Sequence, residues 1–229
     1  MTTPTLLILR PEPGARQTAA RAADQGWRAI VAPIFDIEPV AWEAPDPSNY
    51  DALIVTSANA VRQAGPQLAT YAQLPVHAVG GATAAALRAA GFTDIRPGQG
   101  DAAALLLRAA ADGIGRALHL AGMDHRDARH PAIRLDRRIV YRSVPRDRLD
   151  DALIAAIARE ETLALLHSGR AAAHFAALCE AAGVSRAALR IAALAPAILD
   201  AAGPGWAAAI AADTPDDMAL LAAAARMCH

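Results

Sequence analysis

The feature that most constrains this chain is an internal repeat of strand and helix signals. The segment DALIVTSANAV, which contains Ser57, is matched in the second half by LALLHSGRAAA, which contains Ser168. Two alanine-rich helix signals then end alike, at Gly91 and Gly203, at nearly the same spacing as the serines. Recurrence of this kind indicates a duplicated unit. Each copy combines short apolar strands with helices, a pattern typical of a parallel sheet covered on both faces.

The order of the repeated units predicts that one domain is inserted within another. Three strand–helix units recur in both halves, but the two remaining strands of each sheet come from different places in the chain. We expect the central copy to take them from its C-terminal side and the other copy from the N-terminus. The expected domains are residues 1–33 with 146–229, a discontinuous domain, and residues 50–136, the insert.

Two alternating, proline-punctuated segments join these domains. Residues 34–49 and 137–145 cross between the domains and have similar patterns, so we expect them to pair as a two-stranded β linker. The predicted fold class is therefore α/β, with two flavodoxin-like parallel-sheet domains of five strands each, one inserted in the other.

Composition excludes several kinds of partner. The formal charge is −1 at pH 7 and all 22 basic residues are arginine, which gives no electrostatic reason to bind nucleic acid and permits no lysine chemistry. Two widely separated cysteines, Cys179 and Cys228, are typical of reduced thiols in the cytoplasm. Because charged residues or glycines interrupt every alanine-rich run, we expect no membrane span.

Ligands of open parallel sheets bind beyond the carboxyl ends of the strands. Two facing sheets would place these rims on either side of a cleft. The rim residues are mostly small hydroxyls and glycines with uncovered backbone N–H groups, which suit an acidic ligand. The candidates for binding are Arg10, Ser57, Ala58, Asn59, Gly81, Thr83, Gly122 and Ser168.

Several candidates have a simpler structural explanation. Ser57 and Ser168 are good N-caps, and Gly80-Gly81 with Thr83 reads as a turn and cap before a helix. This turn lacks the spacing of a dinucleotide fingerprint. The polar run His119–His130 has no pair of histidines at helical spacing, so a solvated loop is favoured over a metal site. We expect an interrupted helix over residues 127–135.

Tyr141 is the candidate catalytic residue. It stands between Arg138 and Arg142 in the second linker segment, in a chain with only three tyrosines. A phenol beside bound substrate can donate or accept a proton. The alternative is a tyrosine that simply packs on the hinge.

Over essentially its whole length the chain resembles the uroporphyrinogen-III synthase family. The resemblance rests on the order and spacing of several segments rather than on one motif. These segments include LLILRPEPGA, DALIVTSANAV, VHAVGGATAAALRAAGF, LHLAG, RIVYRSVP and LALLHSGRAAAHF. One departure is Ala195-Pro196-Ala197-Ile198, where the family often has Gly-Pro-Thr-Thr, so any contribution from those threonines is absent.

The resemblance implies a cofactor-free enzyme that cyclises the linear tetrapyrrole hydroxymethylbilane to uroporphyrinogen III with inversion of ring D. It implies Tyr141 as the general acid that helps expel the hydroxyl as water. Ser57, Thr83 and Ser168 would be cleft hydroxyls, with amides near Ala58 and Gly81 holding acetate and propionate groups.

The further expectations concern class and partners. The chain would be a cyclising hydro-lyase and a cytoplasmic monomer, with no nucleic-acid or membrane partner and with transient contact to hydroxymethylbilane synthase. The residues themselves leave one alternative open, a non-catalytic two-lobed binding protein with a hinge.

Overall fold

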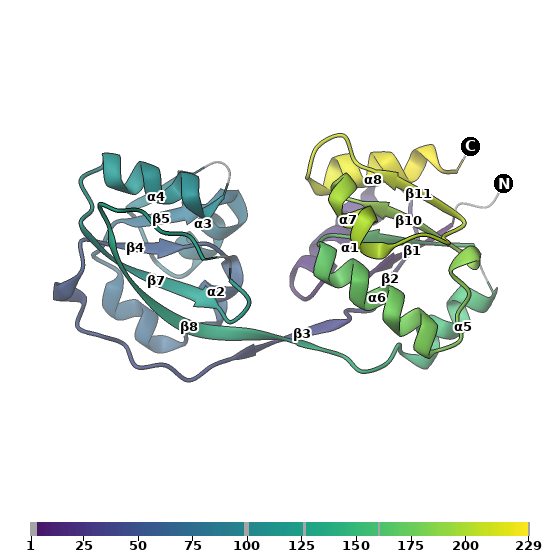
Figure 1. Ribbon diagram of the computed structural model, residues 1–229, viewed down its shortest axis with the longest axis horizontal. Helices are drawn as coiled ribbons and strands as arrows, with labels where there is room; N and C mark the ends of the chain where they lie inside the picture. Colours follow the sequence, from purple (N-terminus) through teal and green to yellow (C-terminus); the bar gives the residue numbers. More distant parts are fainter. Residues whose placement is uncertain (1–3, 99–100, 126, 160, 229) are drawn as a thin grey trace. The chain divides into compact units, whose positions relative to one another are not determined.

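The computed structural model describes residues 4–98, 101–125, 127–159 and 161–228. They form two compact units (Figure 1). Unit 1 contains the described residues up to Asp36 and those from Val144 onward, and unit 2 is Ile37–Ser143. The chain passes between the units twice, so unit 1 is discontinuous in sequence and unit 2 is continuous.

Unit 1 is built on five parallel strands in the spatial order β11-β10-β9-β1-β2. If the five strands are numbered 1 to 5 along the chain and the sheet is read from the β2 edge, the order is 2-1-3-4-5. This is the order of flavodoxin-like sheets. The strands are β1 (Thr5–Ile8), β2 (Ala29–Val31), β9 (Thr162–Leu166), β10 (Leu189–Ala193) and β11 (Ala208–Ala211).

Helices cover both faces of this sheet. Along β1, Leu6 and Ile8 face α1 (Gly14–Asp24) and α8 (Asp217–Arg226). Leu7 lies on the opposite face, in the core shared with three other helices. Strands buried on both faces are therefore apolar throughout. The three helices are α5 (Asp151–Arg159), α6 (Gly169–Ala181) and α7 (Pro196–Ala202), and a 3-10 turn, Arg186–Ala188, precedes β10.

Unit 2 has five parallel strands in the order β6-β5-β4-β7-β8, with β3 beside β8 at the edge. Two helices and a 3-10 segment cover one face and α4 covers the other. The strands are β3 (Phe35–Pro39), β4 (Ala52–Val55), β5 (Val76–Val79), β6 (Ile95–Gly98), β7 (Arg116–Gly122) and β8 (Arg134–Pro145). The helical segments are the 3-10 turn Pro47–Asn49, α2 (Ala58–Gln63), the 3-10 segment Pro66–Tyr71, α3 (Gly80–Ala89) and α4 (Ala102–Ala111).

The two sheets have the same spatial plan. Strand for strand, β11-β10-β9-β1-β2 corresponds to β6-β5-β4-β7-β8, with the repeated segments of the sequence on β9 and β4. The sheets differ in the strand that comes first along the chain. This strand is β1 in unit 1, whereas among the parallel strands of unit 2 it is β4, the counterpart of β9. The predicted fold class, two parallel-sheet α/β domains, is confirmed.

Strands β3 and β8 carry the chain between the units. The backbone N–H of Val40 donates to the carbonyl of Val140 at 3.0 Å, and that of Arg146 donates to the carbonyl of Ile34 at 3.0 Å. Residue numbers rise on one strand as they fall on the other, so the pairing is antiparallel. Cross-strand ion pairs join Arg142 to Glu38 at 2.7 Å and Arg146 to Asp36 at 2.9 Å.

The expected helix over residues 127–135 is wrong. Residues 127–129 have no regular structure, His130 and Ile133 form an isolated antiparallel bridge, and β8 begins at Arg134. Pro131 has no N–H to donate to a helical hydrogen bond, so it sits at a turn instead. Ile133 is buried against the α4 face of the sheet, which draws this segment into the edge of the unit.

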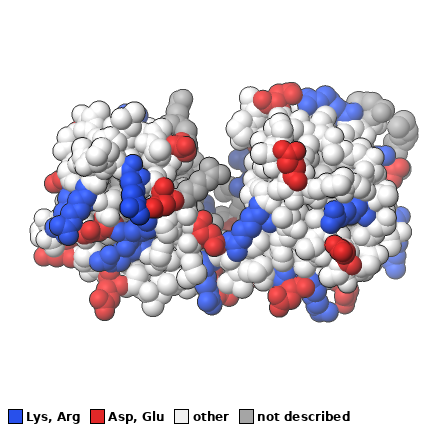
Figure 2. Space-filling model, in the orientation of Figure 1, with Lys and Arg blue, Asp and Glu red and all other residues white. Residues whose placement is uncertain are grey.

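Positive and negative side chains alternate over the surface rather than gathering by sign, on the face that Figure 2 shows. That distribution gives a polyanion no continuous basic track on this face. None of the helices within the described ranges has both the length and the apolar character needed to cross a membrane.

Candidate functional site

The carboxyl end of β4 leads directly into α2 through Thr56 and Ser57. The Ser57 hydroxyl oxygen accepts a hydrogen bond from the backbone N–H of Asn59 at 3.1 Å, so Ser57 caps the helix. The cap uses the oxygen as acceptor and leaves the hydroxyl proton available to a ligand. Ala58 is the first residue of the helix, and the Asn59 side-chain oxygen accepts from Arg62 at 3.1 Å.

Unit 1 repeats this arrangement at the end of β9. The Ser168 hydroxyl oxygen accepts from the backbone N–H of Ala171 at 3.2 Å and caps α6. Capping, the simpler explanation of Ser57 and Ser168, is therefore present at both positions. Because each cap employs only the oxygen, it does not compete with donation of the proton to an acidic group.

The Gly-Gly segment differs from the expected turn. Helix α3 begins at Gly80 itself, directly after β5, and the preceding Val79 offers it no side-chain cap. Gly80 has φ of +72°, a conformation that glycine adopts without steric cost. Thr83 therefore lies inside the helix and is 4% exposed, so it neither caps the helix nor stands in a turn. Gly81 remains in the first helical turn, where backbone N–H groups favour an anion.

Gly122 and Tyr141 are brought together. They are register partners at the carboxyl end of β7, where a β-bulge between Ala121 and Gly122 shifts the pairing by one residue. The backbone N–H of Met123 donates to the carbonyl of Tyr141 at 2.9 Å. A Cβ atom on Gly122 would lie 2.4 Å from the Tyr141 ring, so the ring occupies space that only glycine leaves. Bulges commonly re-aim a side chain beside an active site.

Arg10 lies at the corresponding edge of unit 1 and is held by Asp217. Its guanidinium donates to the Asp217 carboxylate at 3.1 Å and covers Gly14. The same carboxylate accepts from Arg21 at 2.6 Å and from the Thr18 hydroxyl at 2.7 Å.

A histidine completes this cluster. His167 Nε2 lies 3.3 Å from Asp217 Oδ1, and both side chains are largely buried. Burial alone would raise the pKa of the Asp217 carboxyl, but His167, Thr18 and Arg10 outweigh it and hold the pKa well below its usual range. Burial lowers the pKa of His167. Arg10 therefore forms an ion pair with the largely buried Asp217 carboxylate through Nη1. Any contact with a ligand would use the other nitrogens of its guanidinium.

His119 on β7 was not among the predicted site residues. It is 2% exposed, its Nε2 lies 3.1 Å from the Thr56 hydroxyl oxygen, and Arg137 donates to its Nδ1 at 3.2 Å. Burial lowers the pKa of His119 to about 3, with further lowering by the nearby charge of Arg137, so the ring is neutral. The signal in the sequence was a single polar residue inside the apolar strand ALHLA.

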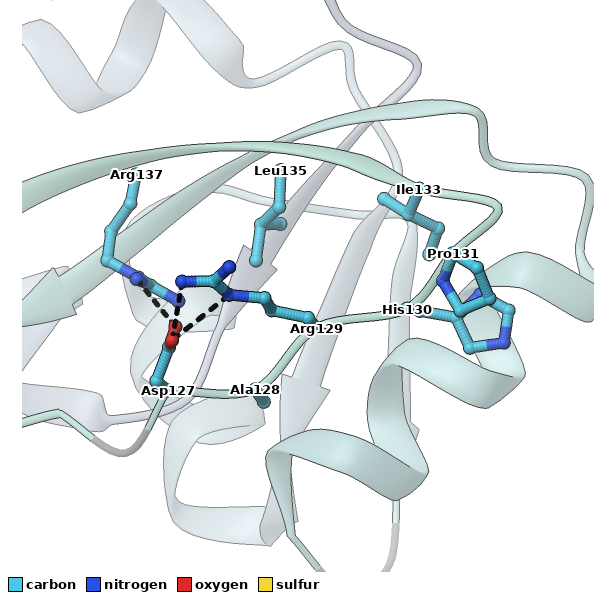
Figure 3. A pocket seen from close by; sticks show the side chains of 8 residues that line it. All are labelled: Asp127, Ala128, Arg129, His130, Pro131, Ile133, Leu135 and Arg137. Atoms are coloured by element: carbon cyan, nitrogen blue, oxygen red, sulfur yellow. Dashed lines mark hydrogen bonds and ion pairs between the residues drawn. The ribbon is translucent and has the colours of Figure 1, made fainter.

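Arg137, which contacts His119, also lines a cavity of about 470 Å³ (Figure 3). Asp127 accepts from Arg137 at 3.2 Å and lies 2.8 Å from Arg129, so both arginines at this end are paired. None of the residues predicted for the rims lines the cavity. Its lining is Asp127, Ala128, Arg129, His130, Pro131, Ile133, Leu135 and Arg137. Among the described residues, no three His, Cys, Asp or Glu side chains are grouped to hold a metal ion.

The fold and rims define a class: an α/β protein with two doubly wound sheets whose strand ends present hydroxyls and helix amides. A family model described as uroporphyrinogen-III synthase HemD matches residues 16–222. The chain belongs to this family, whose members are enzymes of haem biosynthesis.

A solved structure supports this fold. Uroporphyrinogen-III synthetase from Helicobacter pylori matches with a TM-score of 0.63 and 15% identity, over 99% of this chain and 100% of that one. Uroporphyrinogen III synthase from Thermus thermophilus matches at 18% identity over 100% of both chains, with a TM-score of 0.42. Only the first is similar enough to support the fold. A search of curated proteins by sequence found no match.

Replacing Gly122 by alanine should move Tyr141. The added methyl group would overlap the phenol ring, so we expect displacement of the ring. Because the phenol is the far end of a half-buried side chain, we expect a loss of about 1 kcal/mol in the free energy of unfolding, at the low end for overpacking. Gly115→Ala is the matched control, since its methyl group would meet Asp51 at an ordinary 3.6 Å. Urea unfolding measures both variants, and equal stability of the two would contradict the close contact.

Buried neutral histidine should make stability depend on pH. The unfolded chain binds a proton at His119 near pH 6.5, whereas the folded chain does so only near pH 3. Stability attributable to this residue is thus complete above pH 6.5 and falls by about 1.4 kcal/mol per unit as the pH drops toward 3. His119→Gln should flatten the urea-unfolding profile between pH 6.5 and 4.5, whereas Thr56→Val, which keeps the imidazole, should not. Equal slopes in all three proteins would refute the buried neutral state.

Proposed function

We propose that this chain is a uroporphyrinogen-III synthase, which converts hydroxymethylbilane to uroporphyrinogen III and water with inversion of ring D. In this reaction it acts as a cyclising hydro-lyase. The observation that carries the proposal is the family match over residues 16–222. The rims support it, because the substrate is rich in acetate and propionate groups and the rims offer hydrogen-bond donors.

Substrate carboxylates would bind to groups whose protons are not donated to any other residue in the described part of the chain. These are the hydroxyl protons of Ser57 and Ser168 and the first-turn amides of Ala58 and Gly81. Asn59 and Arg10 would contribute from the same edges of their units. Thr83 is buried, so it would act by shaping the floor of the rim more than by open donation.

Tyr141 would act as general acid. Protonation of the departing hydroxyl by the phenol releases water and leaves an azafulvene, which is attacked by the substituted carbon of ring D itself. Fragmentation and reclosure then give the inverted ring, and the phenolate recovers its proton from the macrocycle. Gly122 leaves room for the phenol at the carboxyl end of β7. The other proposed substrate contacts of unit 2 would lie at the same edge of the sheet. Uncatalysed closure gives the uninverted isomer, so positioning accounts for much of the effect.

The remaining proposals concern how the substrate reaches the enzyme, where the enzyme is located and its oligomeric state. The substrate closes spontaneously to the wrong isomer, which favours direct, transient transfer from hydroxymethylbilane synthase. We infer a cytoplasmic monomer, in keeping with two cysteines that are both free thiols. The family match gives no support to the alternative, a hinge-type binding protein without chemistry.

A coupled assay tests the function. Porphobilinogen and hydroxymethylbilane synthase supply the substrate, and chromatography after oxidation separates isomers I and III. We expect isomer III to predominate when this protein is present and isomer I when it is omitted. Isomer I alone, with folded protein present, would rule out the synthase.

The variant Tyr141→Phe tests whether Tyr141 is the general acid. The variant keeps the ring over Gly122 but cannot donate a proton, so we expect turnover to fall about a hundredfold with little change in KM. Tyr50→Phe is the matched control, because Tyr50 donates to Asp136 next to the amino end of β4. Unchanged turnover in Tyr141→Phe would refute the proton-donor role.

A further inference from the structure

A second hydroxyl lies next to Ser57 at the end of β4, and a buried histidine sets its direction. We propose that Thr56 donates a hydrogen bond to a substrate carboxylate and that His119 is the positioning residue that fixes Thr56 as a donor. This inference rests on the proposed function and adds a specificity element to the same rim.

The direction of each hydrogen bond follows from the arginine in the chain of contacts. Arg137 Nη1 donates to Asp127 at 3.2 Å, as Figure 3 shows, and its Nε donates to His119 Nδ1 at 3.2 Å. A guanidinium has no acceptor, so Nδ1 must accept. A neutral imidazole that accepts at Nδ1 carries its proton on Nε2, and this proton points at Thr56 Oγ1, 3.1 Å away.

The sheet makes this arrangement rigid. His119 and Arg137 are register partners on β7 and β8, and Ile54 is the partner of His119 on β4. The histidine is 2% exposed, whereas Thr56 is half-buried at the rim. A hydrogen bond made from a buried, immobile donor is ordered before any ligand arrives.

Two neighbouring hydroxyls thereby become donors. Thr56 accepts from His119 and Ser57 accepts from the backbone N–H of Asn59, so each has its own proton left to offer. Ionised carboxylates accept hydrogen bonds and donate none. A pair of hydroxyls with protons to offer thus suits an ionised carboxylate, whereas an ammonium has no lone pair to accept from them.

His77 provides a contrast on the same face of the sheet. It is the register partner of Ile54 on the opposite side, is fully buried, and neither ring nitrogen has a hydrogen-bond partner within the described residues. It therefore resembles His119 in burial but lacks a contact to the rim. Removal of His77 is the matched control for removal of a buried imidazole.

Nitrogen-15 spectroscopy of the histidine rings tests the positioning without any reaction. We expect His119 as the neutral Nε2–H tautomer from pH 8 to pH 5, in wild type and in Thr56→Val. The Nδ1–H tautomer, or a charged ring at pH 6, would overturn the proposal.

Steady-state kinetics with hydroxymethylbilane generated in situ test the role in binding. We expect Thr56→Val and His119→Leu each to raise KM about five- to tenfold with less than a twofold change in kcat. The double variant should be no worse than Thr56→Val alone, because His119 acts through Thr56. Thr56→Ser and His119→Gln retain a hydrogen-bond donor, so their KM should stay close to the wild-type value. The KM of His77→Leu should equal that of the wild type.

The proposal would be overturned if the KM increases of the two single variants multiply in the double variant. It would also be overturned if Thr56→Val keeps the wild-type KM. If His119→Leu does not fold, the comparison of KM between Thr56→Val and Thr56→Ser decides whether the Thr56 hydroxyl binds the substrate. A wild-type protein that forms no isomer III refutes the proposed function instead, and the tautomer measurement then still tests the contact between His119 and Thr56.

Discussion

Parallel backbone pairing is the constraint on which the rest of this structure depends. Hydrogen bonds between parallel strands place all their carboxyl ends at one edge of a sheet. The turns after β4, β5 and β7 therefore converge in unit 2, and those after β1, β9 and β10 converge in unit 1. Because helices follow most of these turns, the same edge collects helix amides and capping hydroxyls. The donor-rich rims are a consequence of this topology rather than of any one motif.

The two units share a plan but differ in chemistry. In unit 1, Arg10, Thr18, Arg21 and His167 all converge on Asp217, so the strong charges at this rim neutralise one another inside the protein. In unit 2 the neutral His119 contacts a rim hydroxyl, and the Tyr141 ring lies on a glycine. The proposed proton transfer and directed donors thus fall in unit 2. Unit 1 would contribute mainly binding, through Ser168.

Repetition made the fold predictable, since the matched segments with Ser57 and Ser168 fixed which strands correspond. The caps followed from local chemistry. Tyr141 was predicted in a linker segment, and its pairing with Gly122 comes from the register of β7 and β8, which local chemistry does not reveal. What failed depended on tertiary contacts. Burial of Ile133 overrode the helical pattern around Pro131, and a helix beginning at Gly80 drew Thr83 into the interior. Likewise, nothing in the sequence revealed that His119 contacts Thr56, because that contact requires the register of three strands.

The central claim is that the residues proposed at the carboxyl ends of the strands bind the tetrapyrrole. Titration of nitrogen-15-labelled protein with uroporphyrinogen III, kept reduced, tests it most directly through the backbone amide resonances. The account predicts that shifts concentrate at Thr56–Asn59, Gly81, Gly122 and Ser168, and spare the amino ends of the strands. Shifts confined to the cavity lined by Asp127 and Arg137, or to the amino ends of the strands, would contradict it.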